Sequence, residues 1–218
     1  MRLTLYGVAV SAFVAKVRTA LDFKGLAFEE REPPGGYGSE AYRTLVPAGS
    51  VPGLVVDGIG LHGSNAILEF LEDLAPTPAL LPEGAVARAR VRGLLDFHDN
   101  RVEAAVRALF PLVKRDWRAE AEAVEAACLG VEAACTRLQA LEPDAPWRAG
   151  AAPSWVDLGF PCTFQMAAML GAEMDRPLPL PPALADWAAA CAEIPAVARS
   201  LALHRAAMEN WMAGFRRG

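Results

Sequence analysis

Ser11 is the first residue of this chain whose type and position could do chemistry. It follows an apolar stretch that runs from Leu5, and a helical spacing of apolar residues begins directly after it. A serine hydroxyl at a helix N-terminus accepts a hydrogen bond from a free backbone N–H, and the positive end of the helix dipole there favours an anion. Ser11 could therefore be a helix cap, the working group of an active site, or both.

The same stretch has a third interpretation, as a secretory signal peptide with its cut site near Ser11. Arg2 is followed by thirteen uncharged residues, which superficially fits such a leader. However, Gly7 interrupts the apolar run early, and the run continues without a polar break into a helical pattern that contains Lys16 and Arg18. We therefore expect a cytoplasmic protein rather than a secreted one.

The composition indicates a chain that can bury a large core. Of the 218 residues, 53% are hydrophobic and 22% are charged, which argues against disorder. The net charge of −5, without a dominant run of Lys or Arg, argues against binding to nucleic acid. The longest uncharged stretches, 3–15 and 158–172, are shorter than the ~20 apolar residues of a membrane span. We expect neither nucleic acid nor a membrane as a partner.

The cysteines give no sign of a metal or disulfide framework. They show no C-x-x-C spacing and have no histidine at metal-ligand spacing. We interpret them as buried thiols in a reducing compartment, and we expect no metal site. These residues are Cys128, Cys135, Cys162 and Cys191.

The first 75 residues predict the order βαβαββα. Gly7 ends the first strand and Gly25 ends the first helix. Asp57-Gly58 is a strong hairpin signal between two strands. Ser39 and Ser64 are the expected N-caps of the second and third helices. In order, the ranges are a strand at 3–6, a helix at 11–24, a strand at 26–32, a short helix at 40–45, two strands within 51–63 and a helix at 64–74.

The remainder of the chain predicts helices only. A proline-rich linker at 76–84 precedes it, so we expect domains at 1–75 and 85–218. Apolar residues hold one helical face over 91–109, a second helix is expected over 117–141, and a break covers 142–154. Ser154 and Asp157 have the spacing of a capping box, Pro161 should kink the helix that follows, and two more helices should start near Pro182 and Pro195.

This order of elements resembles the cytosolic glutathione transferase superfamily, in its serine-type, bacterial-like form. The resemblance rests on LYG with S-x-F-V-x-K-V-R-x-A-L (5–21), PAGSVPGL (47–54), SNAILEFL (64–71) and SWVDL (154–158). It implies a thioredoxin-like α/β domain followed by an all-α domain. It also implies a homodimer, glutathione as co-substrate bound in the first domain, and a small electrophile as the second substrate.

The resemblance also implies roles for particular residues. Ser11 would be the catalytic residue that stabilises the glutathione thiolate, because only the thiolate attacks. A cis Val51–Pro52 bond would leave the Val51 backbone free to pair with glutathione, and the N–H groups at Gly63-Ser64 would hold its γ-glutamyl carboxylate. The implied glutathione-binding residues are Phe13, Ser50, Val51, Pro52, Gly63 and Ser64, and those of the second-substrate pocket are Val10, Phe13, Arg107 and Phe110.

Two departures from the family pattern weaken the expected glutathione site. Gly63 stands where the family usually has an acidic residue, and Ser50 stands where it often has Lys. Two charged anchors for the ligand are therefore missing. Lys16, Arg18 and Arg43 are three cations that could compensate.

We expect a transferase that conjugates glutathione thiolate to an electrophilic, largely apolar small molecule, as in detoxification. A glutathione-dependent isomerase or lyase on the same fold is one alternative, because the same Ser11 would serve it. A non-catalytic binding protein that keeps the fold is another, favoured by Gly63 and Ser50. His98 with Asp99 could suggest acid–base chemistry, but His98 continues an apolar helical stripe and is interpreted as a core residue.

Overall fold

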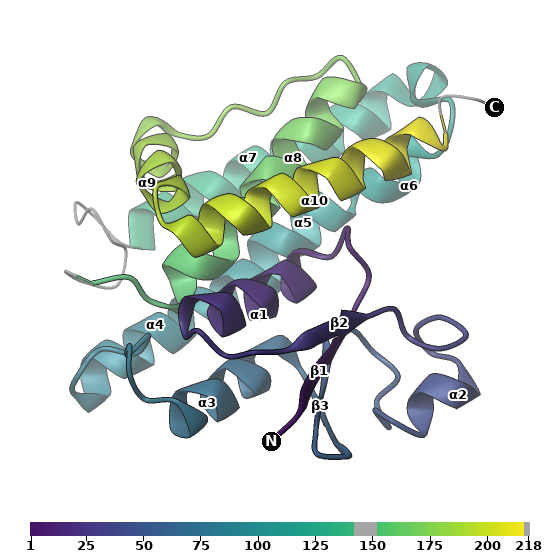
Figure 1. Ribbon diagram of the computed structural model, residues 1–218. Coiled ribbons are helices and arrows are strands. Elements are labelled where there is room, and N and C mark those ends of the chain that lie inside the picture. The colour runs from purple at the N-terminus through teal and green to yellow at the C-terminus, as the bar shows by residue number, and fades with distance from the viewer. Residues whose placement is uncertain (142–151, 216–218) are drawn as a thin grey trace.

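The chain folds into a small sheet-bearing part followed by a larger helical part, as the computed structural model shows for residues 1–141 and 152–215 (Figure 1). The first part has the predicted order βαβαββα. Its elements are β1 (Leu3–Tyr6), α1 (Ala12–Phe23), β2 (Glu29–Arg31), α2 (Glu40–Arg43), β3 (Gly53–Val56), β4 (Ile59–His62) and α3 (Ser64–Leu74). The predicted fold class, a thioredoxin-like α/β unit followed by helices, is confirmed.

The four strands form one mixed sheet in the order β2-β1-β3-β4. β1 pairs parallel with β2 and antiparallel with β3, and β3 pairs antiparallel with β4. Asp57 and Gly58 form the predicted two-residue turn, with φ of 47° and 93°, which is the left-handed backbone that such hairpin turns need. β2 is shorter than the predicted 26–32, because it lies at the sheet edge and pairs with β1 over three residues only.

The two faces of the sheet are covered by different helices. Leu3 and Leu5 of β1 belong to the main core, which also contains the buried faces of α1 and α3. Tyr6 points to the opposite face, since successive strand residues alternate, and it packs there with Tyr42 of α2 and Val46. The sheet is therefore sandwiched between α1 and α3 on one side and α2 on the other.

The regular elements of the second part are helices, and no strand occurs among its described residues. A continuous helical run covers 85–107, but the single expected stripe is interrupted by a π-helical turn, His98–Val102. A short 3₁₀ turn, Trp117–Glu120, replaces the start of the predicted 117–141 helix. The helices are α4 (Ala85–Phe97), α5 (Glu103–Arg107), α6 (Leu109–Val113), α7 (Ala121–Leu141), α8 (Trp155–Glu173), α9 (Pro182–Ala192) and α10 (Pro195–Ala213).

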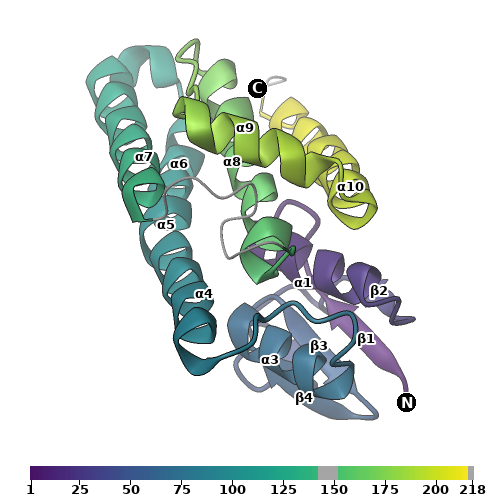
Figure 2. The same cartoon turned by 90° about the vertical axis from the view of Figure 1, so that its left-hand side faces the viewer.

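Helix α1 joins the two parts of the molecule. It packs against α3 on the sheet side and against α8 and α10 on the helical side, and both views show it between the sheet and the helices (Figures 1 and 2). α3 ends at Leu74 and α4 begins at Ala85; the division into two domains there stays a prediction. No helix in the described part of the chain combines the length and apolarity needed to cross a bilayer.

Most predicted caps are confirmed, and one is wrong. The hydroxyls of Ser11 and Ser39 accept from backbone N–H groups at the starts of α1 and α2, and Ser154 forms a capping box with Asp157. Ser64 is not the N-cap of α3, because the helix begins at Ser64 itself and Gly63 holds the cap position with φ of 80°. That backbone favours glycine.

Two predictions concern the start of α8. Pro161 lies inside that helix, and the kink expected there stays a prediction. The predicted break at 142–154 falls for the most part on residues 142–151, which lie outside the described residues.

Candidate active site

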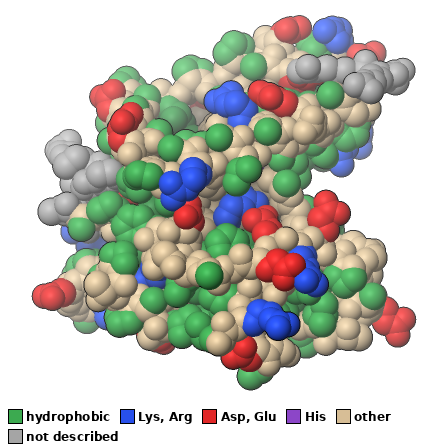
Figure 3. All heavy atoms as spheres, viewed as in Figure 1, with side chains coloured by type: hydrophobic (Ala, Val, Ile, Leu, Met, Phe, Trp, Pro, Cys, Tyr) green, Lys and Arg blue, Asp and Glu red, His purple; other side chains and the backbone are tan. Residues whose placement is uncertain are grey.

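A cavity of about 710 Å³ lies between the sheet-bearing part and the helices. Its walls come from the loop between β1 and α1, from the segment around α2 up to β3, and from α5, α6, α8 and α10. In the space-filling view the surface is hollowed on the right, between the lower part and the upper helices (Figure 3). The cavity thus collects residues that are more than 200 positions apart in the sequence, since its lining runs from Val8 to Trp211.

Ser11 lies on the wall of this cavity at the start of α1. Its Oγ accepts a hydrogen bond from the Val14 backbone N–H at 3.3 Å, and only 8% of the residue is exposed. The hydroxyl proton remains available to a group in the cavity, because the capping bond uses the oxygen as an acceptor. Ser11 therefore combines a cap with a donor directed at a site where the helix dipole favours negative charge.

Val51 brings backbone polar groups to the same cavity. The Val51–Pro52 bond is cis, as the resemblance implied. Among the described residues, no backbone–backbone hydrogen bond involves Val51. The preceding carbonyl, of Ser50, accepts from the buried Tyr42 hydroxyl at 3.0 Å. The hydrogen bond from Tyr42 helps to fix the backbone at Ser50 and Val51. The Val51 N–H and C=O groups can therefore pair with an extended ligand.

Six of the residues predicted for the site line this one cavity. They are Val10, Ser11, Ser50, Val51, Arg107 and Phe110. Pro52, Gly63 and Ser64 are not on its wall, although Pro52 follows a lining residue and Ser64 begins α3. Phe13 is not on the wall either, but its ring lies against the Arg107 guanidinium, whose Cζ is 5.1 Å from the ring centroid.

The three cations expected to replace the missing anchors are engaged elsewhere. Lys16 is buried, with its ammonium 2.8 Å from Asn65 Oδ1 and 2.9 Å from Asp99 Oδ2. Arg18 is paired with Glu30, and Arg43 donates to a backbone carbonyl. None of these three lines the cavity.

Of the Lys and Arg residues that the structure describes, Arg107 and Lys114 line the cavity wall. Lys114 was missed by the sequence analysis. Its ammonium lies 5.4 Å from the centroid of the Trp211 ring, which also lines the cavity. Lys114 follows Arg107 by seven positions, and Arg107 follows Glu103 by four. This helical spacing could have placed the three side chains on one face.

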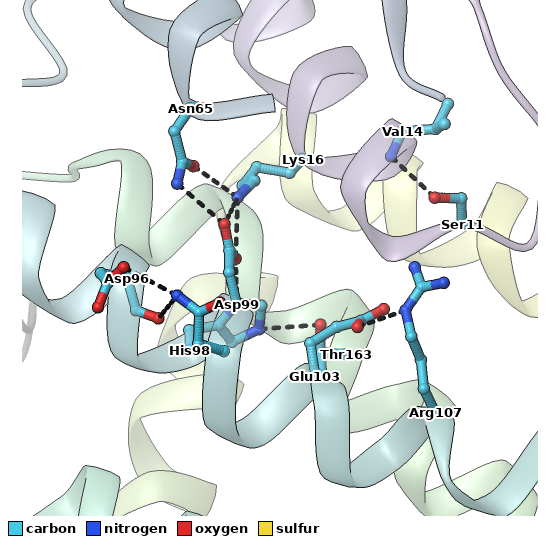
Figure 4. A network of polar contacts seen from close by, with 11 residues as sticks. Ser11, Val14, Lys16, Asn65, Asp96, His98, Asp99, Glu103, Arg107 and Thr163 are labelled. Atoms are coloured by element: carbon cyan, nitrogen blue, oxygen red, sulfur yellow. Dashed lines mark hydrogen bonds and ion pairs between the residues drawn. The ribbon is translucent and has the colours of Figure 1, made fainter. Parts of the chain in front are cut away.

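Glu103 is a second residue that the sequence analysis missed. Its side chain is 2% exposed, and its Oε2 accepts from Arg107 Nε at 2.6 Å. Burial raises the pKa of the Glu103 carboxyl, and the neighbouring Arg107 opposes that rise. Figure 4 shows the pair beside a larger polar network that links Lys16, Asn65 and Asp99.

His98 is a core residue, as predicted. It is 1% exposed and its ring stacks on Phe160 with centroids 3.9 Å apart. Its Nδ1 lies 2.8 Å from Asp99 Oδ1 and its Nε2 lies 2.9 Å from Thr163 Oγ1. Burial lowers the pKa of the imidazole, which favours its neutral form, while the neighbouring Asp99 opposes that shift. His98 does not line the cavity.

The four cysteines are buried thiols, as predicted. They do not line the cavity. Within the described residues, no group of three or more His, Cys, Asp and Glu side chains is placed to hold a metal ion.

Comparison with known proteins links the first part of the chain to one family. Residues 5–79 match the family model described as the glutathione S-transferase N-terminal domain. Maleylacetoacetate isomerase of Rattus norvegicus is 40% identical over 97 residues, which cover 42% of this chain and 45% of that protein. The chain thus matches less than half the length of this curated relative.

Solved structures resemble the chain over nearly its full length. The theta class glutathione S-transferase from Xanthomonas axonopodis pv. citri, with glutathione bound, is 27% identical with a TM-score of 0.74 and covers 91% of this chain and 96% of its own. Maleylacetoacetate isomerase from Anaeromyxobacter dehalogenans, with dicarboxyethyl glutathione and citrate in the active site, is 28% identical with a TM-score of 0.69. The match covers 91% of this chain and 94% of that one.

Proposed function

Because this chain belongs to the cytosolic glutathione transferase superfamily, we propose that it is a glutathione-dependent isomerase of unsaturated dicarboxylates. The observation that carries the proposal is one cavity in which Ser11, at the start of α1, faces a wall that holds Arg107 and Lys114. A thiolate and a dicarboxylate are both anions, and this cavity offers both a helix N-terminus and two cations.

The relatives favour isomerisation over the conjugation expected from the sequence. Curated relatives named maleylacetoacetate isomerase match less than half of the chain, and a neighbour of the same name holds dicarboxyethyl glutathione and citrate. Conjugation to an apolar electrophile is supported only at the level of the superfamily. A maleyl group is a cis-unsaturated diacid, so we take a cis-to-trans conversion as the reaction.

The residues present fit glutathione as the thiol. Its sulfur, once bound, supplies a nucleophile that adds reversibly to the electron-poor double bond and so permits rotation. Ser11 would donate a hydrogen bond to that sulfur, and the N-terminus of α1 would favour its negative charge, which together lower the thiol pKa. The Val51 backbone would hold the cysteinyl part, and the N-terminus of α3 the γ-glutamyl carboxylate.

The helical wall would bind the second substrate. Arg107 and Lys114 would hold its carboxylates, while Val10 and Phe110 exclude water from the reacting atoms. Fixing the double bond next to the sulfur converts a bimolecular step into one that is effectively intramolecular. In this scheme Arg107 and Lys114 would orient the second substrate, and Ser11 would increase the fraction of glutathione present as thiolate.

The test is a paired assay that follows the loss of maleylacetoacetate and the concentration of free thiol. We expect isomerisation that requires glutathione and leaves the thiol concentration unchanged over many turnovers. Conversion with an equal loss of thiol would identify conjugation instead. Calorimetric binding of glutathione without either reaction would indicate a non-catalytic binding protein. The homodimer and the cytoplasmic location also stay predictions.

A further inference from the structure

The Glu103–Arg107 pair differs from an ordinary surface ion pair in the unequal burial of its partners. The Glu103 side chain is 2% exposed and the Arg107 side chain is 54% exposed. Their one hydrogen bond, of 2.6 Å, joins the carboxylate to Nε of the guanidinium rather than to its outer nitrogens. The buried Glu103 carboxylate therefore holds Arg107 at Nε, and Nη1 and Nη2 of the guanidinium extend beyond this hydrogen bond.

The outer end of Arg107 faces the cavity without a partner from the protein. Among the described residues, Nη1 and Nη2 of Arg107 make no hydrogen bond. The Phe13 ring supports the guanidinium from one side, at 5.1 Å from its centroid. In the close-up view the outer nitrogens point away from Glu103 and toward the side on which Ser11 lies (Figure 4). The two outer nitrogens of a guanidinium presented in this way, called its fork here, can donate two parallel hydrogen bonds to one carboxylate.

Glu103 is well suited to fix this geometry. It is one helical turn before Arg107, and burial leaves its carboxylate little freedom to rotate. The other charges near it are Lys16, which is tied to Asp99 and Asn65, and Asp99 itself. Arg107 is thus the cation that Glu103 can orient toward the cavity.

We infer that Glu103 is a positioning residue that aims the Arg107 fork at a carboxylate bound beside Ser11. The inference deepens the proposed function and rests on its choice of cavity. The carboxylate belongs to the second substrate or to the glycyl end of glutathione, since both are ligands of one cavity in the proposed reaction. No bond forms or breaks at either residue.

The experiment is a double-mutant cycle in the full-length protein with Glu103→Gln, Arg107→Gln and the double variant. Glutamine keeps the shape of Glu103 and an acceptor oxygen but removes its charge. Calorimetric affinity for glutathione and for sodium maleate is measured for each protein, with KM and kcat where turnover is present. We expect each single variant to bind one of these ligands about tenfold more weakly, because a charge-assisted hydrogen bond is lost. The double variant should bind as Arg107→Gln does.

Arg92→Gln is the matched control. Arg92 lies on the same helical run and also donates from Nε to a glutamate, Glu69, but both partners are exposed and neither lines the cavity. It should bind both probes as the wild type does. Arg107→Lys is the second test, because it keeps the charge and an exposed position without offering a fork. It should bind as weakly as Arg107→Gln.

The outcomes separate the two claims. Weaker binding of maleate alone assigns the fork to the second substrate, and weaker binding of glutathione alone assigns it to the glycyl carboxylate. Additive effects in the double variant, full affinity in Arg107→Lys, or failure of the wild type to bind either probe would overturn the inference. An absence of isomerisation with normal binding would instead refute the proposed reaction and leave the positioning role standing on the titrations.

Discussion

At the scale of single residues, Ser11 shows how one side chain can serve the fold and the chemistry together. Its oxygen caps α1 while its proton remains free to be donated into the cavity. The two roles are separable by experiment, because capping acts on the free energy of unfolding and donation acts on turnover. A second capping serine, Ser154, lies away from the cavity and serves for comparison.

We expect Ser11→Ala to lower kcat by about tenfold or more, since a hydrogen bond to a charged group contributes roughly 1.5–3 kcal/mol. Loss of the cap should lower the free energy of unfolding by about 1 kcal/mol. Steady-state kinetics at saturating glutathione and urea unfolding measure the two effects. Ser154→Ala, which removes a cap with the same 3.3 Å bond and also a 2.8 Å hydrogen bond from the hydroxyl to Asp157 Oδ2, should lose more stability and keep its kcat. Unchanged turnover in Ser11→Ala would rule out the proposed role of this hydroxyl.

At the scale of elements, the site depends on how closely α1 approaches α8. Gly159 of α8 permits this close approach of the two helices, because a Cβ added at this position would lie 2.8 Å from Cδ of Lys16. Lys16 cannot easily move aside, since it is buried and its ammonium is tied to Asn65 and Asp99. The position of α1, and with it that of Ser11, therefore depends on the absence of a side chain at 159.

Gly159→Ala should lower the free energy of unfolding by about 1–3 kcal/mol, the usual effect of overpacking a core. Gly130→Ala is a control that should change the free energy of unfolding in the opposite direction. Gly130 is an exposed residue of α7 with nothing within 4 Å of an added Cβ, so alanine there should stabilise the helix by up to about 1 kcal/mol. Chemical denaturation of both variants checks the pair. Equal effects at the two sites would show that helix propensity, and not the contact with Lys16, controls the result.

At the scale of the whole molecule, a buried histidine couples folding to pH. His204 of α10 is fully buried, and its Nδ1 lies 3.1 Å from Gln165 Nε2 on α8. Burial lowers the pKa of this imidazole to about 4, and the nearby charges of Arg18 and Arg205 act in the same direction. Between that value and the ordinary pKa of about 6.5, the unfolded chain binds a proton that the folded chain does not. Stability must therefore fall as the pH falls through this window.

We expect His204 alone to reduce the free energy of unfolding by about 2 kcal/mol between pH 7 and pH 5, since each unit of pKa difference is worth about 1.4 kcal/mol. His204→Gln removes the titrating group and keeps a polar side chain of similar size. Urea unfolding of both proteins at the two pH values measures the difference. The variant should lose less stability than the wild type on acidification. Parallel losses in the two proteins would place the acid sensitivity in other groups, such as His98.

The local pattern of the sequence was sufficient for most of the fold. Alternation and turn residues predicted the hairpin at Asp57-Gly58, and helical periodicity with capping residues predicted the starts of α1, α2 and α8. These features depend on neighbours within a few positions, so the sequence contains their cause. The predicted N-cap at Ser64 was wrong by one residue. The helix begins at Ser64, and Gly63 takes the cap position with a positive φ.

The sequence by itself also determined which residues could do chemistry, with Ser11, Val51 and Arg107 among those that line the cavity. Only the tertiary structure decided which charges meet there. Lys16 was a candidate anchor for the ligand, but the fold buries it against Asp99. Glu103 and Lys114 were not predicted for the site, and the packing of α5 and α6 places them on the same cavity wall as Ser11. Whether a charge points into a cavity depends on elements packed from far along the chain. No local pattern encodes that packing, because burial and pairing belong to the assembled molecule.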